Sequence, residues 1–399
     1  MNFKRVVLGV FCILFCFSKI GFAEEDGVDY WYWVRTGIGY ERNKDYDGAL
    51  YCFNKAVEEH PGDRIFYNYR ASFYAQQKNY PSAIADYTSA LELDPSVVVN
   101  YSSRAKLYEK RQQYDEALLD YTTELAVVAK RNETAQYKYV PKAVYHDRAA
   151  LYYRLGRYDE AFADYTEEIN AYEAEDPSDK RFGFNVRGRG TAYCARGNVS
   201  LVKKDYASAI QDFSDAIKIA PACVPGYFYR GKAYLLTQEY EKAIADYDEA
   251  LAGNLVKDKA GQIIMHTNRG EAYAGVKDYD KALADYDAAL TLGGQSHELY
   301  WLKGTACGVL NKIDQAMESY QKCIVLKPDF IPVYIDRAKL YEKINNNAMA
   351  IGDYTKAINL APDQSALYIA RANCYRVLGQ KKLAKADLAM VRQLQKRAK

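Results

Sequence analysis

Small and aromatic residues recur along this chain at helical spacing. Tyr67, Ala71 and Tyr74 are separated by four and three residues, which places them on one face of an α-helix. A second helical segment in each unit is built around an alanine, and these alanines are Ala49, Ala83, Ala117, Ala161, Ala209, Ala243, Ala282, Ala316, Ala350 and Ala384. Their intervals are 34, 34, 44, 48, 34, 39, 34, 34 and 34 residues. A period of this size predicts stacked pairs of helices rather than one globular core.

A second small residue precedes most of these alanines by twelve positions. Small residues on both helices of a pair allow close approach of the backbones, and aromatic side chains fill the remaining space. Most of the 39 tyrosines fall on such inward positions, which favours packing over a ligand cage. The small residues are Gly37, Ala71, Ala105, Ala149, Gly231, Gly270, Gly304, Ala338 and Ala372, and in the fifth unit we assign the displaced Gly190.

This unit resembles the tetratricopeptide repeat family, whose 34-residue helix-turn-helix carries a small residue, a tyrosine, an alanine, an aromatic residue and a closing proline. The prolines are Pro61, Pro95, Pro221, Pro328 and Pro362. The resemblance covers about residues 30–399. It implies an all-α, right-handed superhelical solenoid of about ten repeats with a C-terminal capping helix, used as a generic binding scaffold.

The repeats divide the expected chain into five parts. We expect a signal peptide at 1–23, repeats 1–3 at 30–128, an insertion with repeat 4 at 129–183, repeats 5–7 with insertions at 184–296, and repeats 8–10 with a basic capping helix at 297–399. The longer intervals place extra residues near 126–141, 170–183, 194–204 and 252–263. Residues 176–181 are the strongest loop candidate, and Asn132-Glu-Thr and Asn198-Val-Ser are expected on exposed loops or helix extensions.

Arginine and aspartate recur together in eight units, whereas the first and eighth units lack both. This joint presence predicts an ion pair inside each helical hairpin, because a half-buried charge without a partner is costly. A row of ligand-binding arginines is the alternative. The expected pairs are Arg70 with Asp86, Arg104 with Asp120, Arg148 with Asp164, Arg189 with Asp212, Arg230 with Asp246, Arg269 with Asp285, Arg337 with Asp353, and Arg371 with Asp387.

The N-terminal segment has the order of a secretory signal. Lys4 and Arg5 precede an apolar stretch at 6–17, and small residues follow at Gly21 and Ala23. The chain is therefore expected to be exported, to the periplasm or cell envelope if the source is bacterial. An uncleaved N-terminal anchor is the alternative.

Charge argues against a nucleic-acid partner. The chain has 54 basic and 52 acidic residues, and removal of 1–23 would leave it almost neutral, without the positive field that phosphate backbones attract. The segment after Arg376 is nevertheless basic. We interpret it as the polar cap that a solenoid needs, with weak contact to an anionic surface as the alternative.

The sequence offers no catalytic or metal-binding pattern. Its four histidines are scattered, and Arg187-Gly-Arg-Gly190 lacks the strand and the Lys-Ser/Thr of a phosphate-binding loop. We therefore expect no enzyme activity, metal or cofactor. The six cysteines after residue 23 are interpreted as small buried hydrophobes, and Cys307 with Cys323 is the first candidate if any pair forms.

The groove of the resembled family is lined by first-helix residues two positions before and after the arginine. These positions show no adjacent Lys and Asn of a carboxylate clamp, but become apolar with lysines in the later repeats. The groove candidates are Phe228, Lys232, Trp301, Thr305, Ile335, Lys339, Ile369 and Asn373. Packing of Trp301, Ile335 and Ile369 between adjacent helices is the alternative.

These observations predict a non-catalytic protein–protein interaction scaffold of the cell envelope that binds a peptide or helix of a partner in its concave groove. One alternative is an adaptor that regulates, or delivers substrate to, a periplasmic hydrolase. Another is a self-assembling structural protein.

Overall fold

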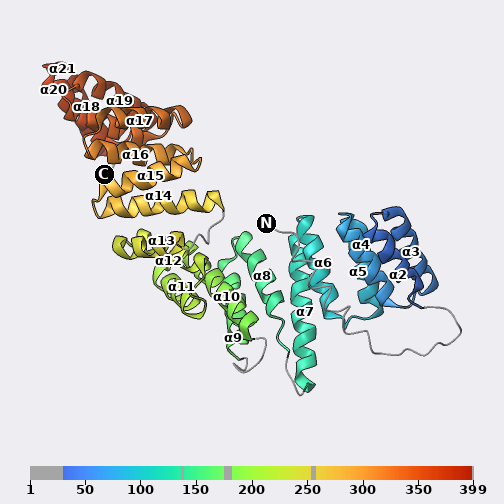
Figure 1. The fold of residues 1–399 in the computed structure, drawn as a ribbon. Helices are drawn as coiled ribbons and strands as arrows, with labels where there is room; N and C mark the ends of the chain where they lie inside the picture. The colour runs from blue at the N-terminus through green and yellow to red at the C-terminus, as the bar shows by residue number, and fades with distance from the viewer. Residues whose placement is uncertain (1–29, 136–138, 175–181, 253–257, 398–399) are drawn as a thin grey trace. The chain divides into compact units, whose positions relative to one another are not determined.

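The computed structural model describes residues 30–135, 139–174, 182–252 and 258–397. Over these residues the chain forms 20 helices and no strand, in successive packed pairs, which confirms the all-α fold (Figure 1). The expected signal peptide at 1–23 and the loop candidate at 176–181 lie outside the described residues. The chain separates into two compact units, residues 1–151 and 152–399.

The first unit contains three complete helix pairs. The second helix of each of the first two pairs also contacts the first helix of the next pair, so that the three pairs stack. The pairs are α2 (Tyr32–Arg42) with α3 (Tyr46–Glu59), α4 (Arg64–Gln76) with α5 (Tyr80–Leu93), and α6 (Val98–Lys110) with α7 (Tyr114–Thr134). The division between the units falls inside α8 (Lys142–Arg154).

The second unit begins with α9 (Tyr158–Glu173) and continues as six pairs. From α10 to α18, the first helices of neighbouring pairs also contact one another and form a continuous face. The pairs are α10 (Phe182–Val202) with α11 (Tyr206–Ile219), α12 (Val224–Leu236) with α13 (Tyr240–Ala252), α14 (Lys259–Gly275) with α15 (Tyr279–Thr291), α16 (His297–Val309) with α17 (Ile313–Leu326), α18 (Ile331–Lys343) with α19 (Asn347–Leu360), and α20 (Ser365–Val377) with α21 (Lys381–Arg397).

Each turn between the two helices of a pair uses a residue with left-handed backbone geometry. This residue lies five positions before the repeated alanine, and in several turns the next residue caps the second helix. Asp45, for example, accepts a hydrogen bond of 2.9 Å from the backbone N–H of Gly48. The left-handed residues are Lys44, Lys78, Gln112, Gly156, Lys204, Gln238, Lys277, Asn311, Asn345 and Gly379.

The repeated alanines and the small first-helix residues form the contact within each pair. The alanines are almost completely buried, and Tyr121, Tyr247 and Tyr286 are among the largest fully buried side chains. A Cβ atom added to Gly270 would lie 2.5 Å from the ring of Tyr286. The first helix therefore carries a small residue where the aromatic ring of the second helix packs against it.

The register of the fifth pair differs from the expected one. Gly197, rather than Gly190, packs against the aromatic ring of the second helix, because a Cβ atom at Gly197 would lie 2.7 Å from the ring of Phe213. The extra residues lengthen the N-terminal part of α10 instead of forming an insertion at 194–204. Asn198-Val-Ser is consequently helical, with Val199 fully buried, so the exposed loop, one of the two alternatives expected there, was wrong.

The basic C-terminal segment is the second helix of the tenth pair. Ala384 and Val391 of α21 are buried, whereas its lysines are exposed. The capping helix and the tenth repeat's second helix are thus one element in the described part of the chain. No described helix has the length and apolar character required to cross a membrane.

Candidate functional site

Arginine–aspartate pairs join the two helices of the hairpins. In each, two nitrogens of the guanidinium donate to the two carboxylate oxygens, as in Arg230, whose Nε and Nη2 lie 2.8 and 2.7 Å from Asp246. The aspartates are buried. This bidentate geometry occurs in Arg70–Asp86, Arg104–Asp120, Arg230–Asp246, Arg269–Asp285, Arg337–Asp353 and Arg371–Asp387.

The remaining guanidinium nitrogen extends to the preceding hairpin. Nη1 of Arg230 donates to the hydroxyl of Ser214 at 3.0 Å, and Nη1 of Arg371 donates to Thr355 at 2.9 Å. Each such arginine therefore bonds within its own hairpin and to its neighbour. The inter-hairpin contact was not expected from the sequence, because its acceptors vary among Asn, Thr, Ser, Asp and Gln.

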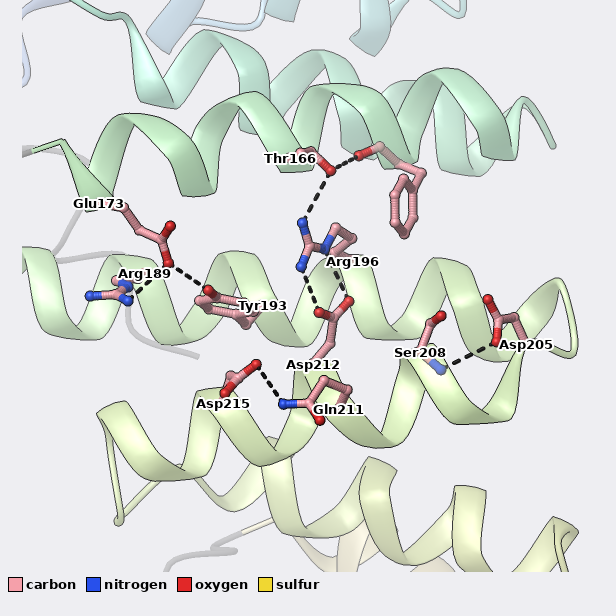
Figure 2. Close-up of polar contacts among 11 residues, drawn as sticks. Thr166, Glu173, Arg189, Tyr193, Arg196, Asp205, Ser208, Gln211, Asp212 and Asp215 are labelled. Carbon is pink, nitrogen blue, oxygen red and sulfur yellow. Dashed lines mark hydrogen bonds and ion pairs between the residues drawn. The ribbon is translucent and has the colours of Figure 1, made fainter.

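The fifth pair corrects one predicted ion pair. Asp212 binds Arg196, with Nε and Nη2 at 3.0 and 2.7 Å, instead of Arg189 (Figure 2). Arg189 lies on the lengthened part of α10 and donates to Glu173 of α9 at 2.9 Å. The shifted register of α10 causes both changes.

The aromatic groove candidates are partly used in packing. The indole N–H of Trp301 donates to Asp336 at 2.9 Å, and its ring packs edge-on against Phe330. Phe228 packs against Tyr229 and Tyr247. Both tryptophan and phenylalanine side chains are partly buried, so much of their surface is used between helices.

The other groove candidates differ in how much of each side chain is exposed and in whether it is already hydrogen-bonded. Thr305 donates back to the carbonyl of Trp301, and Ile335 packs partly buried against the core. Ile369 is 41% exposed. Lys232, Lys339 and Asn373 are exposed. The first-helix face thus offers mainly polar groups and one aliphatic side chain to a partner.

A hollow of about 290 Å³ lies beside Lys232 in the second unit. Its walls come from the end of α8, from α9, from α10 and from α12. Aromatic and aliphatic side chains predominate, with one amide and one ammonium group among them. The lining residues are Tyr153, Tyr165, Ala195, Asn198, Leu201, Val202, Tyr229 and Lys232.

The amide and the ammonium group in this hollow have no bonding partner among the described side chains. Within the described residues, Asn198 and Lys232 make no side-chain hydrogen bond or ion pair. Both follow a repeat arginine by two positions, as does Lys339. The Nζ of Lys339, however, lies 3.0 Å from Asp336. Lys232 is therefore a cation without a compensating carboxylate, next to an amide that can donate or accept.

The sequence identified Lys232 but missed Asn198. The assignment of Gly190 to the fifth unit moved the groove positions to Arg187 and Thr191. With Gly197 in the small position, Asn198 and Lys232 occupy equivalent positions of neighbouring hairpins. An adjacent Asn and Lys are therefore present across these two units, contrary to our expectation.

Five of the six cysteines described by the structure are buried free thiols, as expected, and only Cys223 is partly buried. Cys307 and Cys323 are buried free thiols, so the pair named first from the sequence is not formed. Instead, the Sγ atoms of Cys194 and Cys223 lie 3.7 Å apart. The described residues contain no group of three or more His, Cys, Asp or Glu side chains arranged to hold a metal ion.

Comparisons with known proteins agree with the helical repeat. Models described as tetratricopeptide repeat match residues 35–97, 190–223, 224–252, 264–292, 297–330 and 331–364. The chain is similar to the solved C-terminal part of a repeat-containing protein from Cytophaga hutchinsonii, with 18% identity and a TM-score of 0.52 over 68% of this chain and 98% of that one. It is also similar to a tetratricopeptide repeat protein from Parabacteroides merdae, with 18% identity and a TM-score of 0.42 over 72% and 98%. No curated protein matches the sequence.

Proposed function

Because the chain belongs to the tetratricopeptide repeat family, we propose that it is a non-catalytic scaffold that binds a segment of a partner protein on the first-helix face of its second unit. The fold itself is a general interaction scaffold, so the choice of ligand depends on side chains that differ between repeats. Two such side chains, Asn198 and Lys232, line the hollow formed by residues of α8, α9, α10 and α12.

The observation that carries this proposal is the unpaired Lys232 beside Asn198. An exposed ammonium group next to an amide and an apolar wall favours a ligand with a carboxylate and a nearby apolar side chain. A peptide that ends in, or contains, such a pair of groups fits this chemistry. The half-buried Tyr229 ring supplies an apolar surface that can pack against the ligand.

Export to the cell envelope is the second part of the proposal. It is supported by the charged, apolar and small-residue order of the N-terminal segment. Mass measurement of the protein purified from its source tests it. Loss of residues 1–23 is expected, and a retained N-terminus would contradict cleavage.

A peptide-display selection tests the binding site. Peptides selected on the full protein should carry a carboxylate near an apolar residue. Their affinity should fall about tenfold or more in Lys232→Ala or Asn198→Ala, because one charge-assisted or amide hydrogen bond is lost. Lys339→Ala is the matched control, since that lysine occupies the equivalent position but pairs with Asp336.

Selected peptides that bind both Lys232→Ala and Lys339→Ala as tightly as the unmodified protein would reject the hollow as the site. Measurement of solution mass at several concentrations provides a separate check. A concentration-dependent oligomer blocked by the same peptides would indicate self-assembly through this face instead.

A further inference from the structure

Two cysteines from neighbouring hairpins face each other in the second unit. Cys194 lies within α10, and Cys223 immediately precedes the first residue of α12 as its N-cap. Their Sγ atoms are 3.7 Å apart, within hydrogen-bonding distance for sulfur. The two residues are 29 positions apart in the sequence, so only stacking of the fifth and sixth hairpins brings them together.

The two thiols differ in access. Cys194 is buried, with 6% of its surface exposed, whereas Cys223 is only partly buried. Cys223 also lies at a helix N-terminus, where backbone N–H groups favour a negative charge. The Cys194 thiol donates to its sulfur, and with the backbone N–H of Gly226 this lowers the pKa of Cys223 to about 6 although burial opposes the shift.

The same contact has the reverse effect on Cys194. Donation of its S–H to Cys223, together with burial, raises the pKa of Cys194 above its ordinary value. The two pKa shifts therefore favour negative charge on the more accessible sulfur and retention of the proton on the buried one. This is the arrangement of an attacking and a resolving thiol.

We propose that Cys194 and Cys223 form a reversible disulfide that links the fifth and sixth hairpins. The oxidant is a disulfide compound, such as oxidised glutathione. The Cys223 thiolate attacks one sulfur of that compound, forms a mixed disulfide and releases one thiolate. Cys194 then loses its proton and attacks the Cys223 sulfur, which releases the second thiolate. The two released thiolates take up the two protons, so two protein thiols are oxidised and one disulfide compound is reduced to two thiols.

This disulfide would act on the helices that line the hollow. Cys194 is four residues before Asn198 on α10, and Cys223 is the N-cap of α12, the helix that carries Tyr229 and Lys232. A covalent link between α10 and the start of α12 would limit the movement of one lining helix relative to the other. The disulfide itself does not depend on the proposed peptide binding.

Peptide mapping after equilibration in mixtures of oxidised and reduced glutathione tests the proposal. The folded full protein is alkylated to block free thiols and digested with trypsin. Oxidised protein should yield tryptic peptide 190–196 joined to peptide 219–230, and reduction should separate them. In reduced protein, brief alkylation should modify Cys223 before Cys194.

Cys194→Ala and Cys223→Ala should each abolish the joined peptides, and Cys194→Ala should retain a glutathione adduct on Cys223. Cys307→Ala is the matched control, because Cys307 is also buried and should leave the link intact. A glutathione adduct on Cys223 of the unmodified protein that never gives way to the link would overturn the proposal. So would preferential linkage of other cysteines. Because this result is read from covalent peptides, it is independent of whether the selected peptides bind the hollow.

Discussion

Arg230 binds Asp246 through two guanidinium nitrogens at 2.8 and 2.7 Å, while its third nitrogen donates to Ser214 of the preceding hairpin. One side chain thereby links three helices. In a solenoid, the free energy of unfolding is approximately the sum of the intrinsic stability of each repeat and the interaction energies between neighbouring repeats. Arg230 contributes both to the stability of its own hairpin and to the interaction with the preceding one, so its loss is expected to affect two hairpins.

Arg230→Ala should lower the free energy of unfolding by about 3 kcal/mol, because Asp246 is left as a buried, unpaired charge. Asp246→Ala should cost a similar amount. The double variant should cost less than the sum of the two, with a coupling energy of roughly 1–3 kcal/mol. Urea unfolding of the four proteins measures this coupling.

The eighth hairpin supplies a control for that cycle. Its Lys303 binds the half-exposed Asp287 of the preceding hairpin, and Ser319 replaces the repeat aspartate. Lys303→Ala should therefore cost less than about 1 kcal/mol. Equal losses in Lys303→Ala and Arg230→Ala, or purely additive effects of Arg230→Ala and Asp246→Ala, would contradict a stabilising ion pair.

The fifth hairpin allows two arginines on one helix to be compared. Arg196 and its partner Asp212 have side chains 18% and 6% exposed, whereas Arg189 and its partner Glu173 are 32% and 43% exposed. Arg196→Ala should cost about 3 kcal/mol of unfolding free energy, and Arg189→Ala about 1 kcal/mol or less. Urea unfolding of both variants under one set of conditions tests the difference. A larger loss in Arg189→Ala would support the pairing first expected from the sequence.

The repeat arrangement could be predicted from spacing, but the register of α10 could not. Arg189-Gly190 and Arg196-Gly197 both offer an arginine followed by a small residue. Which of them packs against Phe213 depends on where the extra residues lengthen the helix, and the alanine interval alone does not contain that information. Because of the same ambiguity, Asn198 was not identified from the sequence as a groove residue.

Contacts between repeats were also hard to predict. Comparison of aligned units identifies residues that share a role, so it detects Arg–Asp pairs within a hairpin. It does not show that Trp301 donates to Asp336, which lies 35 residues away on the next first helix. Nor does it bring Cys194 to Cys223, because each cysteine occurs once at its position. Individual side chains in neighbouring repeats must be placed in space before such pairs become visible.

The pH dependence of stability should reveal the environment of Asp285. Burial raises its pKa, but hydrogen bonds and charge from Arg269 and His266 outweigh burial, so the pKa of Asp285 lies below its ordinary value. Between this folded-state pKa and about 3.9, the unfolded chain binds more protons than the folded protein. The stabilisation from Asp285 is therefore present above that range and is lost as pH falls through the folded-state pKa.

His266→Ala should raise the pKa of Asp285, because one hydrogen bond of 2.8 Å to its carboxylate is removed. Carboxyl NMR titration measures the shift directly. Asp246 is the internal reference, since burial exceeds the effect of Arg230 and leaves its pKa raised. An unchanged titration of Asp285 in the variant would contradict the assigned role of His266.

Two exposed glycines of the last hairpins should respond in opposite directions to replacement by alanine. Gly379 has φ +75° in the turn between α20 and α21, whereas Gly352 lies inside α19, and an added Cβ meets no atom within 4 Å at either position. Gly379→Ala should lower the free energy of unfolding by about 1 kcal/mol, because a side chain disfavours left-handed geometry. Gly352→Ala should raise it by about 1 kcal/mol through helix propensity. Thermal and urea unfolding of both variants measure whether each substitution raises or lowers the free energy of unfolding. Because neither substitution creates a clash, stabilisation by Gly379→Ala would show that this turn does not hold the left-handed conformation in solution.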